Sequence, residues 1–208
     1  MAQPAVVTTP TQERALDAAV ELVARWGVTK TTLGDVARTA GMSRATLYRA
    51  FPGGKDELFS LLGQREVAAF LGVVAGALDA ADDLPTALVD GLHAAAVHLA
   101  GHDAIRFVLA HEPELAVPVL GFAEMDRLLR LVQRAASPHL VRFLAPAEAA
   151  WAAEWLARMF LSALVNPTPA FDLADPVVCD RLVRRYVVPA FASRSAAPAT
   201  VPAALTTL

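Results

Sequence analysis

Apolar residues recur at every third or fourth position along most of this chain, which is the period of an amphipathic helix. No stretch has a convincing strand pattern, so the sequence predicts an all-α protein. We expect helices over residues 10–26, 33–40, 44–51, 55–80, 84–100, 103–111, 122–136, 148–165 and 175–191, and at most a short helical turn within 114–120. Segments 1–8 and 193–208 are expected to be disordered tails.

Two short helices near the N-terminus are marked by their capping residues. Thr32 is a favourable N-cap, and Asp35 faces the free amides of the turn that follows. Gly41 ends this helix where a left-handed conformation is needed, and Ser43 caps the next one. The Pro-Gly-Gly sequence at 52–54 ends that second helix. Two short helices joined by a tight, glycine-containing turn form a helix-turn-helix motif.

The second helix of this motif is suited to reading DNA. Arg44 lies in its first turn, where an arginine can pair with two acceptors of a guanine, and small neighbouring side chains can meet a thymine methyl group. Lys55, at the start of the following helix, suits a phosphate oxygen. The alternative is an ordinary helical hairpin with a solvated basic face. The predicted DNA-contacting residues are Thr32, Gly34, Ser43, Arg44, Ala45, Thr46, Tyr48, Arg49 and Lys55.

The charge distribution favours DNA binding by the N-terminal segment. The whole chain carries a formal charge of −3, from 18 basic and 21 acidic residues. From Thr29 to Lys55, however, five basic residues stand against one acidic residue, whereas 11 basic and 15 acidic residues follow from Leu61 onward. The positive charge is therefore concentrated at the motif, where a phosphate backbone requires it.

A first amphipathic helix ending in Trp26-Gly27 is followed by a series of short motifs: Thr31-Thr32-Leu33, Asp35-Val36-Ala37, Ala40-Gly41-Met42-Ser43, Thr46-Leu47-Tyr48 with Phe51, and Lys55-Asp56-Glu57-Leu58. With these motifs, residues 11–62 closely resemble the N-terminal domain of TetR-family transcriptional regulators. The resemblance implies an all-helical homodimer whose divergent C-terminal domain binds a small molecule and thereby releases DNA. The Pro-Gly-Gly turn replaces the polar turn common in that family, but it leaves Lys55 in register.

This interpretation divides the chain into a helix-turn-helix DNA-binding domain at 9–54 and a helical regulatory and dimerisation domain at 55–192. We expect a repressor that leaves a palindromic double-stranded operator when it binds a small hydrophobic effector, without a cofactor. The single Cys179 excludes an internal disulfide and fits a reducing cytoplasm. The N-terminal residues have no secretory signal pattern, and no membrane partner is expected.

The C-terminal segments are apolar on more than one face, which predicts both a cavity and a dimer surface. We expect an effector cavity lined by apolar side chains and a few polar ones from 98–112. Its predicted ligand-binding residues are Phe107, His111, Glu112, Phe122, Leu129, Phe143 and Met159, with Val132 beside them. The predicted homodimer interface comprises Trp151, Trp155, Phe160, Leu182, Val183 and Tyr186. The alternatives are core packing for both sets and a solvated cap for His111 and Glu112.

Other function classes have weaker support in the sequence. His98 and His102 have the spacing of metal ligands on one helical face, but Gly101 between them disfavours one continuous helix, so no metal site is expected. The sequence contains no phosphate-binding glycine loop or nucleophile elbow, which argues against an enzyme. A ligand-independent architectural DNA-binding dimer is the remaining alternative, and a densely packed C-terminal domain would favour it.

Overall fold

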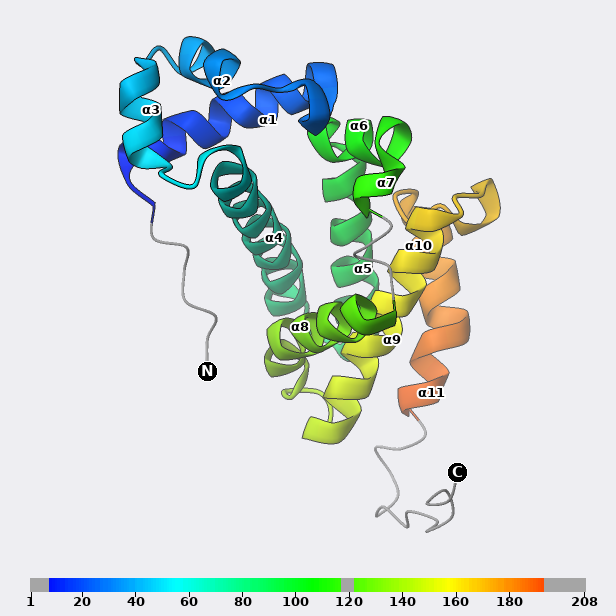
Figure 1. Cartoon of the computed structure of the whole chain (residues 1–208). Helices are drawn as coiled ribbons and strands as arrows, with labels where there is room; N and C mark the ends of the chain where they lie inside the picture. Colours follow the sequence, from blue (N-terminus) through cyan, green and yellow to red (C-terminus); the bar gives the residue numbers. More distant parts are fainter. Residues whose placement is uncertain (1–7, 117–121, 193–208) are drawn as a thin grey trace.

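The computed structural model describes residues 8–116 and 122–192, and within them every regular element is helical (Figure 1). The predicted all-α fold is therefore confirmed. The elements are α1 (Pro10–Lys30), α2 (Leu33–Thr39), α3 (Arg44–Ala50), α4 (Gly54–Ala80), α5 (Leu84–Ala100), α6 (Asp103–His111), α7 (Pro113–Ala116), α8 (Phe122–Leu140), α9 (Pro146–Val165), the 3₁₀ turn η2 (Pro169–Phe171), α10 (Pro176–Leu182), the π-helical turn η3 (Val183–Val187) and α11 (Val188–Ala192).

Helices α1, α2 and α3 form a compact N-terminal unit. Thr9 and Gln12 close a reciprocal capping box at α1, while Thr32 and Ser43 cap α2 and α3 through their side-chain oxygens. One apolar cluster holds the three helices together, and it includes Leu16, Val36, Leu47 and Phe51 together with Leu58 of α4. Because the first turns of α4 belong to this cluster, the domain boundary at residue 54 stays a prediction.

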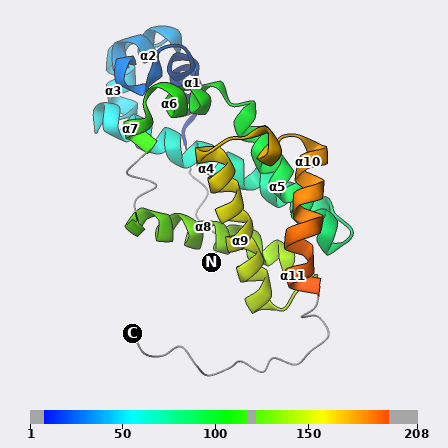
Figure 2. The same ribbon diagram turned by 90° about the vertical axis from the view of Figure 1, so that its right-hand side faces the viewer.

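Helix α4 leaves the N-terminal unit and joins a second helical group made of α5, α8, α9 and the α10–α11 segment (Figures 1 and 2). Its buried residues lie at the two ends, with Leu58 and Leu62 in the first core and Leu78 in the second. The middle of α4 connects the two cores, which is why Val67 is 40% exposed. By length and composition α4 is apolar enough to cross a membrane, but it packs along α5 and α8.

The termini of three helices add detail to the predictions. The regular helix that begins α1 is interrupted at Gly27, where it was predicted to end, because the non-helical torsion angles of this glycine (φ 82°, ψ 172°) produce a kink; a short helical segment then runs to Lys30. Helix α6 begins at Asp103 as predicted and is capped by the ring of His102. Helix α8 runs through Pro138 to Leu140, and the Ser137 hydroxyl donates to the Gln133 carbonyl at 2.6 Å.

The single thiol is an internal part of the C-terminal core. Cys179 in α10 is fully buried, and its Sγ lies 3.7 Å from the carbonyl oxygen of Val89 in α5. Burial raises the pKa of this thiol to about 12, and the neighbouring carboxylates of Asp180 and Asp90 add to the shift. The thiol therefore stays protonated and inert in the folded chain.

Candidate nucleic-acid interface, domain junction and apolar cavity

Helix α3 exposes the side chains that the sequence assigned to DNA. Ser43 accepts a hydrogen bond from the Thr46 amide at 3.0 Å and so fixes the first turn. Leu47 is fully buried and ties the helix to α1 and α2, whereas Tyr48 is 54% exposed. The exposed residues of this helix and its cap are Ser43, Arg44, Ala45, Tyr48 and Arg49, with Thr46 half-buried. This arrangement leaves one face of α3 free for a major groove.

Arg44 lies directly against Gly34 of α2. A Cβ atom built on Gly34 would be 3.0 Å from Nη2 of Arg44, which is tighter than nine in ten Cβ contacts in proteins. The absent side chain at Gly34 therefore lets the guanidinium lie across the start of α2. Thr32, which caps α2 and is exposed, lies on the same helix terminus. Gly34 thus leaves room for the Arg44 side chain, and its predicted contact with DNA stays a prediction.

Lys55 is partly used inside the protein. Its Nζ donates to the carbonyl oxygens of Val28 and Thr29, at 2.8 and 3.1 Å, near the end of α1. An ammonium group has three donors, so one remains for a phosphate. Lys55 therefore joins the start of α4 to the end of α1 in addition to its predicted contact with DNA.

The same bend of α1 binds a carboxylate from the C-terminal part of the chain. The amides of Val28 and Thr29 donate to Oε2 and Oε1 of Glu112, at 2.7 and 2.9 Å. Glu112 follows α6 directly and is only 7% exposed. Burial by itself would raise the pKa of Glu112, but the hydrogen bonds from Thr29 and Val28 and the charge of Lys55 outweigh it, so this pKa lies below its ordinary value.

Glu112 and His111 were predicted to line an effector cavity, but neither borders the enclosed apolar cavity described below. Each carboxylate oxygen of Glu112 accepts one backbone amide of α1. His111 is exposed, its ring stacks on Phe107 with 4.4 Å between the ring centroids, and both residues line a groove between α1 and α6. Glu112 thus joins the N-terminal unit to the C-terminal helices, and a ligand contact of either Glu112 or His111 stays a prediction. A glutamate before a proline gave no sequence signal for this long-range contact.

A second set of polar contacts crosses the same junction. Arg65 of α4 pairs with Glu13 and Asp17 of α1, at 3.1 and 2.7 Å, and with Glu66 beside it. Glu66 in turn accepts a hydrogen bond from Nε2 of His102 at 2.8 Å, because Nδ1 of that ring accepts from the Ile105 amide. His102 is therefore a cap and a junction residue. Its ring packs beside that of His98, with centroids 5.9 Å apart.

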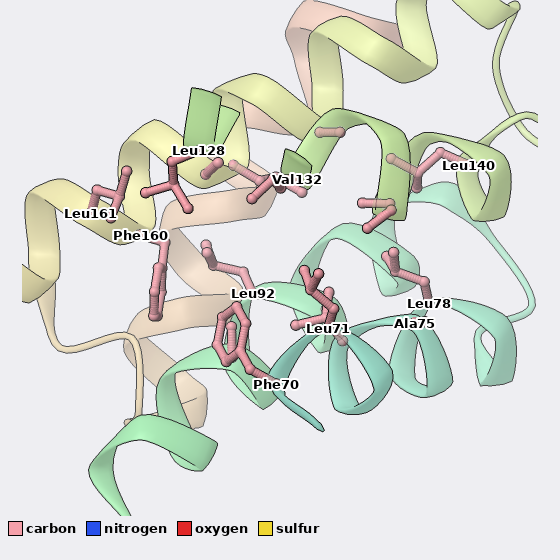
Figure 3. A pocket seen from close by; sticks show the side chains of 18 residues that line it. Phe70, Leu71, Ala75, Leu78, Leu92, Leu128, Val132, Leu140, Phe160 and Leu161 are labelled. Carbon is pink, nitrogen blue, oxygen red and sulfur yellow. The ribbon is translucent and has the colours of Figure 1, made fainter. Parts of the chain in front are cut away.

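A cavity of about 110 Å³ lies between α4, α5, α8 and α9 (Figure 3). All of its lining side chains are apolar. They are Phe70, Leu71, Val74, Ala75 and Leu78 of α4, Gly91, Leu92 and Ala95 of α5, Leu128, Val132, Ala135, Ala136 and Leu140 of α8, and Ala153, Leu156, Ala157, Phe160 and Leu161 of α9. Such a site selects for apolar molecules, since it offers no side-chain hydrogen-bonding group.

The predicted ligand residues lie elsewhere, apart from Val132. Leu129 is buried in α8 and is absent from the cavity wall, and Phe107 faces a groove between α1 and α6. Phe143 and Met159 pack against the C-terminal core. The side chain of Phe122 lies outside the described residues. Apolar residues on one helix share a period, and the period alone does not tell which of two buried faces borders a void.

The predicted dimer residues divide into two groups. Trp151, Trp155 and Tyr186 are 63, 47 and 64% exposed and remain available to a partner. The assignment of Leu182 and Val183 is corrected, because both are buried within the chain's own core. Phe160 is half-buried and lines the cavity, and its place in an interface stays a prediction.

Comparison with known proteins relates the N-terminal segment to a known family. Residues 15–62 match the family described as "Bacterial regulatory proteins, tetR family", which is the segment that holds α1, α2, α3 and the start of α4. The N-terminal segment of the chain is therefore similar to the DNA-binding part of TetR-family regulators. Two uncharacterized HTH-type transcriptional regulators are similar over 99 residues, one of Mycobacterium bovis at 39% identity and one of Mycobacterium tuberculosis H37Rv at 38%. Each match covers 48% of this chain and 50% of the relative, so the chain matches only about half the length of these regulators.

Solved structures of TetR-type regulators share the fold of most of the chain. The TetR family repressor AlkX from Dietzia, implicated in biodegradation of n-alkanes, has 21% identity and a TM-score of 0.60, over 85% of this chain and 94% of AlkX. The fatty acid degradation regulator FadR from Bacillus halodurans has 18% identity and a TM-score of 0.61, over 85% of this chain and 96% of FadR. A complex of SmeT with triclosan has 19% identity and a TM-score of 0.52, over 96% and 100%.

Proposed function

We propose that this protein is a cytoplasmic, homodimeric transcriptional repressor that leaves its palindromic operator when a small hydrophobic ligand enters the C-terminal domain. The observation that carries this proposal is the apolar cavity between α4 and α9 in a chain whose N-terminal helices have an exposed reading face. An architectural DNA-binding protein would need no such void. Neighbours in fold include a regulator captured with triclosan, itself a small molecule, which is in line with a ligand-responsive C-terminal domain.

In the proposed DNA complex, α3 enters the major groove. Arg44 reads a guanine, and Tyr48 and Arg49 contact phosphates on either side. The remaining donor of Lys55 adds a phosphate contact at the start of α4. A two-fold dimer presents two such helices to two half-sites. The exposed Trp151, Trp155 and Tyr186 support a dimer surface on α9 and the α10–α11 segment.

Release of DNA requires that the ligand prefer a conformation in which the two reading helices are wrongly placed, since equal affinity for both conformations shifts nothing. Helix α4 supports such coupling because Leu58 packs in the N-terminal core and Leu71 lines the cavity. Glu112 supports a second route, because it connects the end of α6 to the bend of α1. A ligand that displaces α4 or α6 therefore moves the DNA-binding helices.

The proposal is tested by selecting genomic fragments with the purified protein and sequencing them. We expect one enriched, palindromic sequence, bound by a dimer with a strong salt dependence. Apolar compounds are then screened for a raised melting temperature together with loss of that DNA. Ala157→Leu, which fills the cavity wall, should abolish the response to compounds while leaving DNA affinity intact. Enrichment of no sequence, or compounds that stabilise the protein without releasing DNA, would contradict the proposal.

A further inference from the structure

The inner cavity has an open neighbour. A groove of about 770 Å³ lies between α5, α6, the end of α9 and the η2 segment. Its wall includes Leu99 and Arg106 on one side and Leu164, Pro167 and Phe171 on the other. The groove is several times larger than the cavity of about 110 Å³. It therefore offers the larger volume next to the space that the proposed function assigns to the ligand.

Phe160 is the one residue of the described chain that lines both spaces. It is half-buried on α9, and its ring lies 5.6 Å from that of Phe70 across the cavity (Figure 3). Both rings come from helices that bound the cavity on opposite sides, α4 and α9. Phe160 therefore borders both the cavity and the groove, which makes its side chain the candidate barrier between them.

The two spaces differ in chemistry. The cavity wall is entirely apolar, whereas the groove adds Arg106, Thr168 and Asp172. Arg106 is exposed, and its nearest acidic partner, Asp103, is 3.6 Å away, a loose surface pair. The Asp172 carboxylate already accepts the amide of Ala174 at 3.0 Å. Arg106, which also lines the groove between α1 and α6, is the one cationic side chain among the described residues that line this groove.

We propose, on the basis of the proposed function, that the ligand is a single-chain amphiphile with an anionic head group. Its hydrocarbon chain passes Phe160 into the cavity, and its head binds Arg106 in the groove. The cavity alone is smaller than the ~150 Å³ void that accommodates benzene in an engineered protein, so a longer chain must extend into the groove. An apolar chain with one anionic end matches an apolar cavity beside a groove that holds Arg106, with the head group placed nearer to Arg106 than to the carboxylate of Asp172.

The position of Arg106 also gives the head group a path to the DNA-binding unit. Arg106 lies on α6, and Glu112 directly after that helix binds the amides of Val28 and Thr29 in α1. Helix α6 also packs closely along α1. A head group that draws Arg106 into the groove therefore acts on the helix that carries the junction carboxylate.

The experiment uses three probes with the same ten-carbon chain: decanoate, decan-1-ol and decyltrimethylammonium. Binding to the full-length protein is measured by calorimetry at low salt. We expect decanoate to bind about tenfold more tightly than decan-1-ol, and the ammonium compound to bind most weakly. Arg106→Gln should remove the advantage of decanoate, and Arg158→Gln, which changes an exposed arginine on α9 outside both spaces, should keep it. Equal affinities for decanoate and decan-1-ol, or an unchanged preference for decanoate in Arg106→Gln, would overturn the proposal that Arg106 binds an anionic head group.

The role of Phe160 as the barrier between the groove and the cavity is tested separately, by the rate at which decanoate binds. Phe160→Leu, with a smaller side chain, should speed association several-fold, and Phe160→Trp should slow it. Unchanged rates in both variants would overturn the role of Phe160. Operator binding without ligand is measured for each variant, together with its melting temperature. If the unmodified protein selects no operator but still prefers decanoate, the regulatory function fails while the amphiphile site stands.

Discussion

The carboxylate of Glu112 occupies the space in which a side chain at Gly27 would begin. A Cβ atom at Gly27 would lie 2.7 Å from Cδ and from both carboxylate oxygens of Glu112. Gly27 also has a φ of 82°, a conformation that side chains disfavour. The bend in α1 and the carboxylate 85 positions later in the sequence are therefore parts of one structure. The glycine leaves space for the carboxylate, and the bend exposes the two amides that bind it.

Gly27→Ala should disrupt this junction. The new methyl group meets the carboxylate and forces a strained backbone, so we expect a loss of about 1–3 kcal/mol in the free energy of unfolding and weaker operator binding. Urea titration and fluorescence anisotropy measure the two effects. The matched control is Gly63→Ala in α4, where the added methyl group meets open space. That variant should be more stable by about 0.5–1 kcal/mol, and an equal loss in both variants would contradict the prediction.

The junction should also weaken in acid. The folded-state pKa of Glu112 lies below its ordinary value of 4.5, so the carboxylate stabilises the fold fully above that value and less as the pH falls through the lower folded pKa. Glu112→Gln should therefore show a flatter dependence of unfolding free energy on pH between about pH 5 and pH 3. Glu21→Gln, which alters only an exposed pair with Arg25, is the control. Parallel curves for Glu112→Gln and the unmodified protein would refute the linkage.

Arg44 and Arg49 should differ in their effect on DNA recognition. Arg44→Ala should lose about 1–3 kcal/mol of discrimination between the operator and a variant base pair, if this arginine reads a guanine as proposed. Arg49→Ala should weaken binding to all sequences alike and reduce the salt dependence by about one phosphate contact. Binding isotherms on matched and mismatched operators at several salt concentrations separate the two. An equal loss of affinity for matched and mismatched operators in Arg44→Ala would show that Arg44 contacts a phosphate rather than a base.

The dimer should depend on exposed rather than buried residues of the C-terminal helices. Trp151→Glu and Tyr186→Glu place charges in the proposed apolar contact, so we expect monomers at micromolar concentration and poor operator binding. Val73→Glu, an equally surface-directed change on α4, should remain dimeric. Sedimentation velocity measures the oligomeric state. If Trp151→Glu and Tyr186→Glu both remain dimeric, the dimer interface must lie on another face of the protein.

The N-terminal unit could be predicted from the sequence because its determinants are local. Thr32 and Ser43 bond amides three positions away, and Gly41 has the positive φ of 64° that a helix end requires. Leu47 and Phe51 are four positions apart, the spacing of one helix face, and both are buried. Each of these signals lies within one turn of the structure that it determines, and the family resemblance rests on the same residues.

The candidate site of the C-terminal domain could not be predicted as well, because its contacts join distant residues. Glu112 finds its partners 83 and 84 positions earlier in the chain. Val183 and Tyr186 are both apolar in pattern, yet one is fully buried and the other is exposed, and a π-helical turn at Val183–Val187 rotates the positions after it. Whether a leucine borders a void or fills one depends on the side chains opposite, which periodicity does not encode.

The inert thiol in the C-terminal core makes the native sequence a convenient background for spectroscopic labels. Since Cys179 is buried and its pKa is near 12, maleimide and methanethiosulfonate reagents should leave it unmodified in the folded protein. A cysteine introduced at exposed Arg38 of α2 would then react alone, without removal of the natural one. In a dimer, a pair of such spin labels would measure the distance between the two N-terminal DNA-binding units. The distance could be compared with operator bound, with effector bound and with neither.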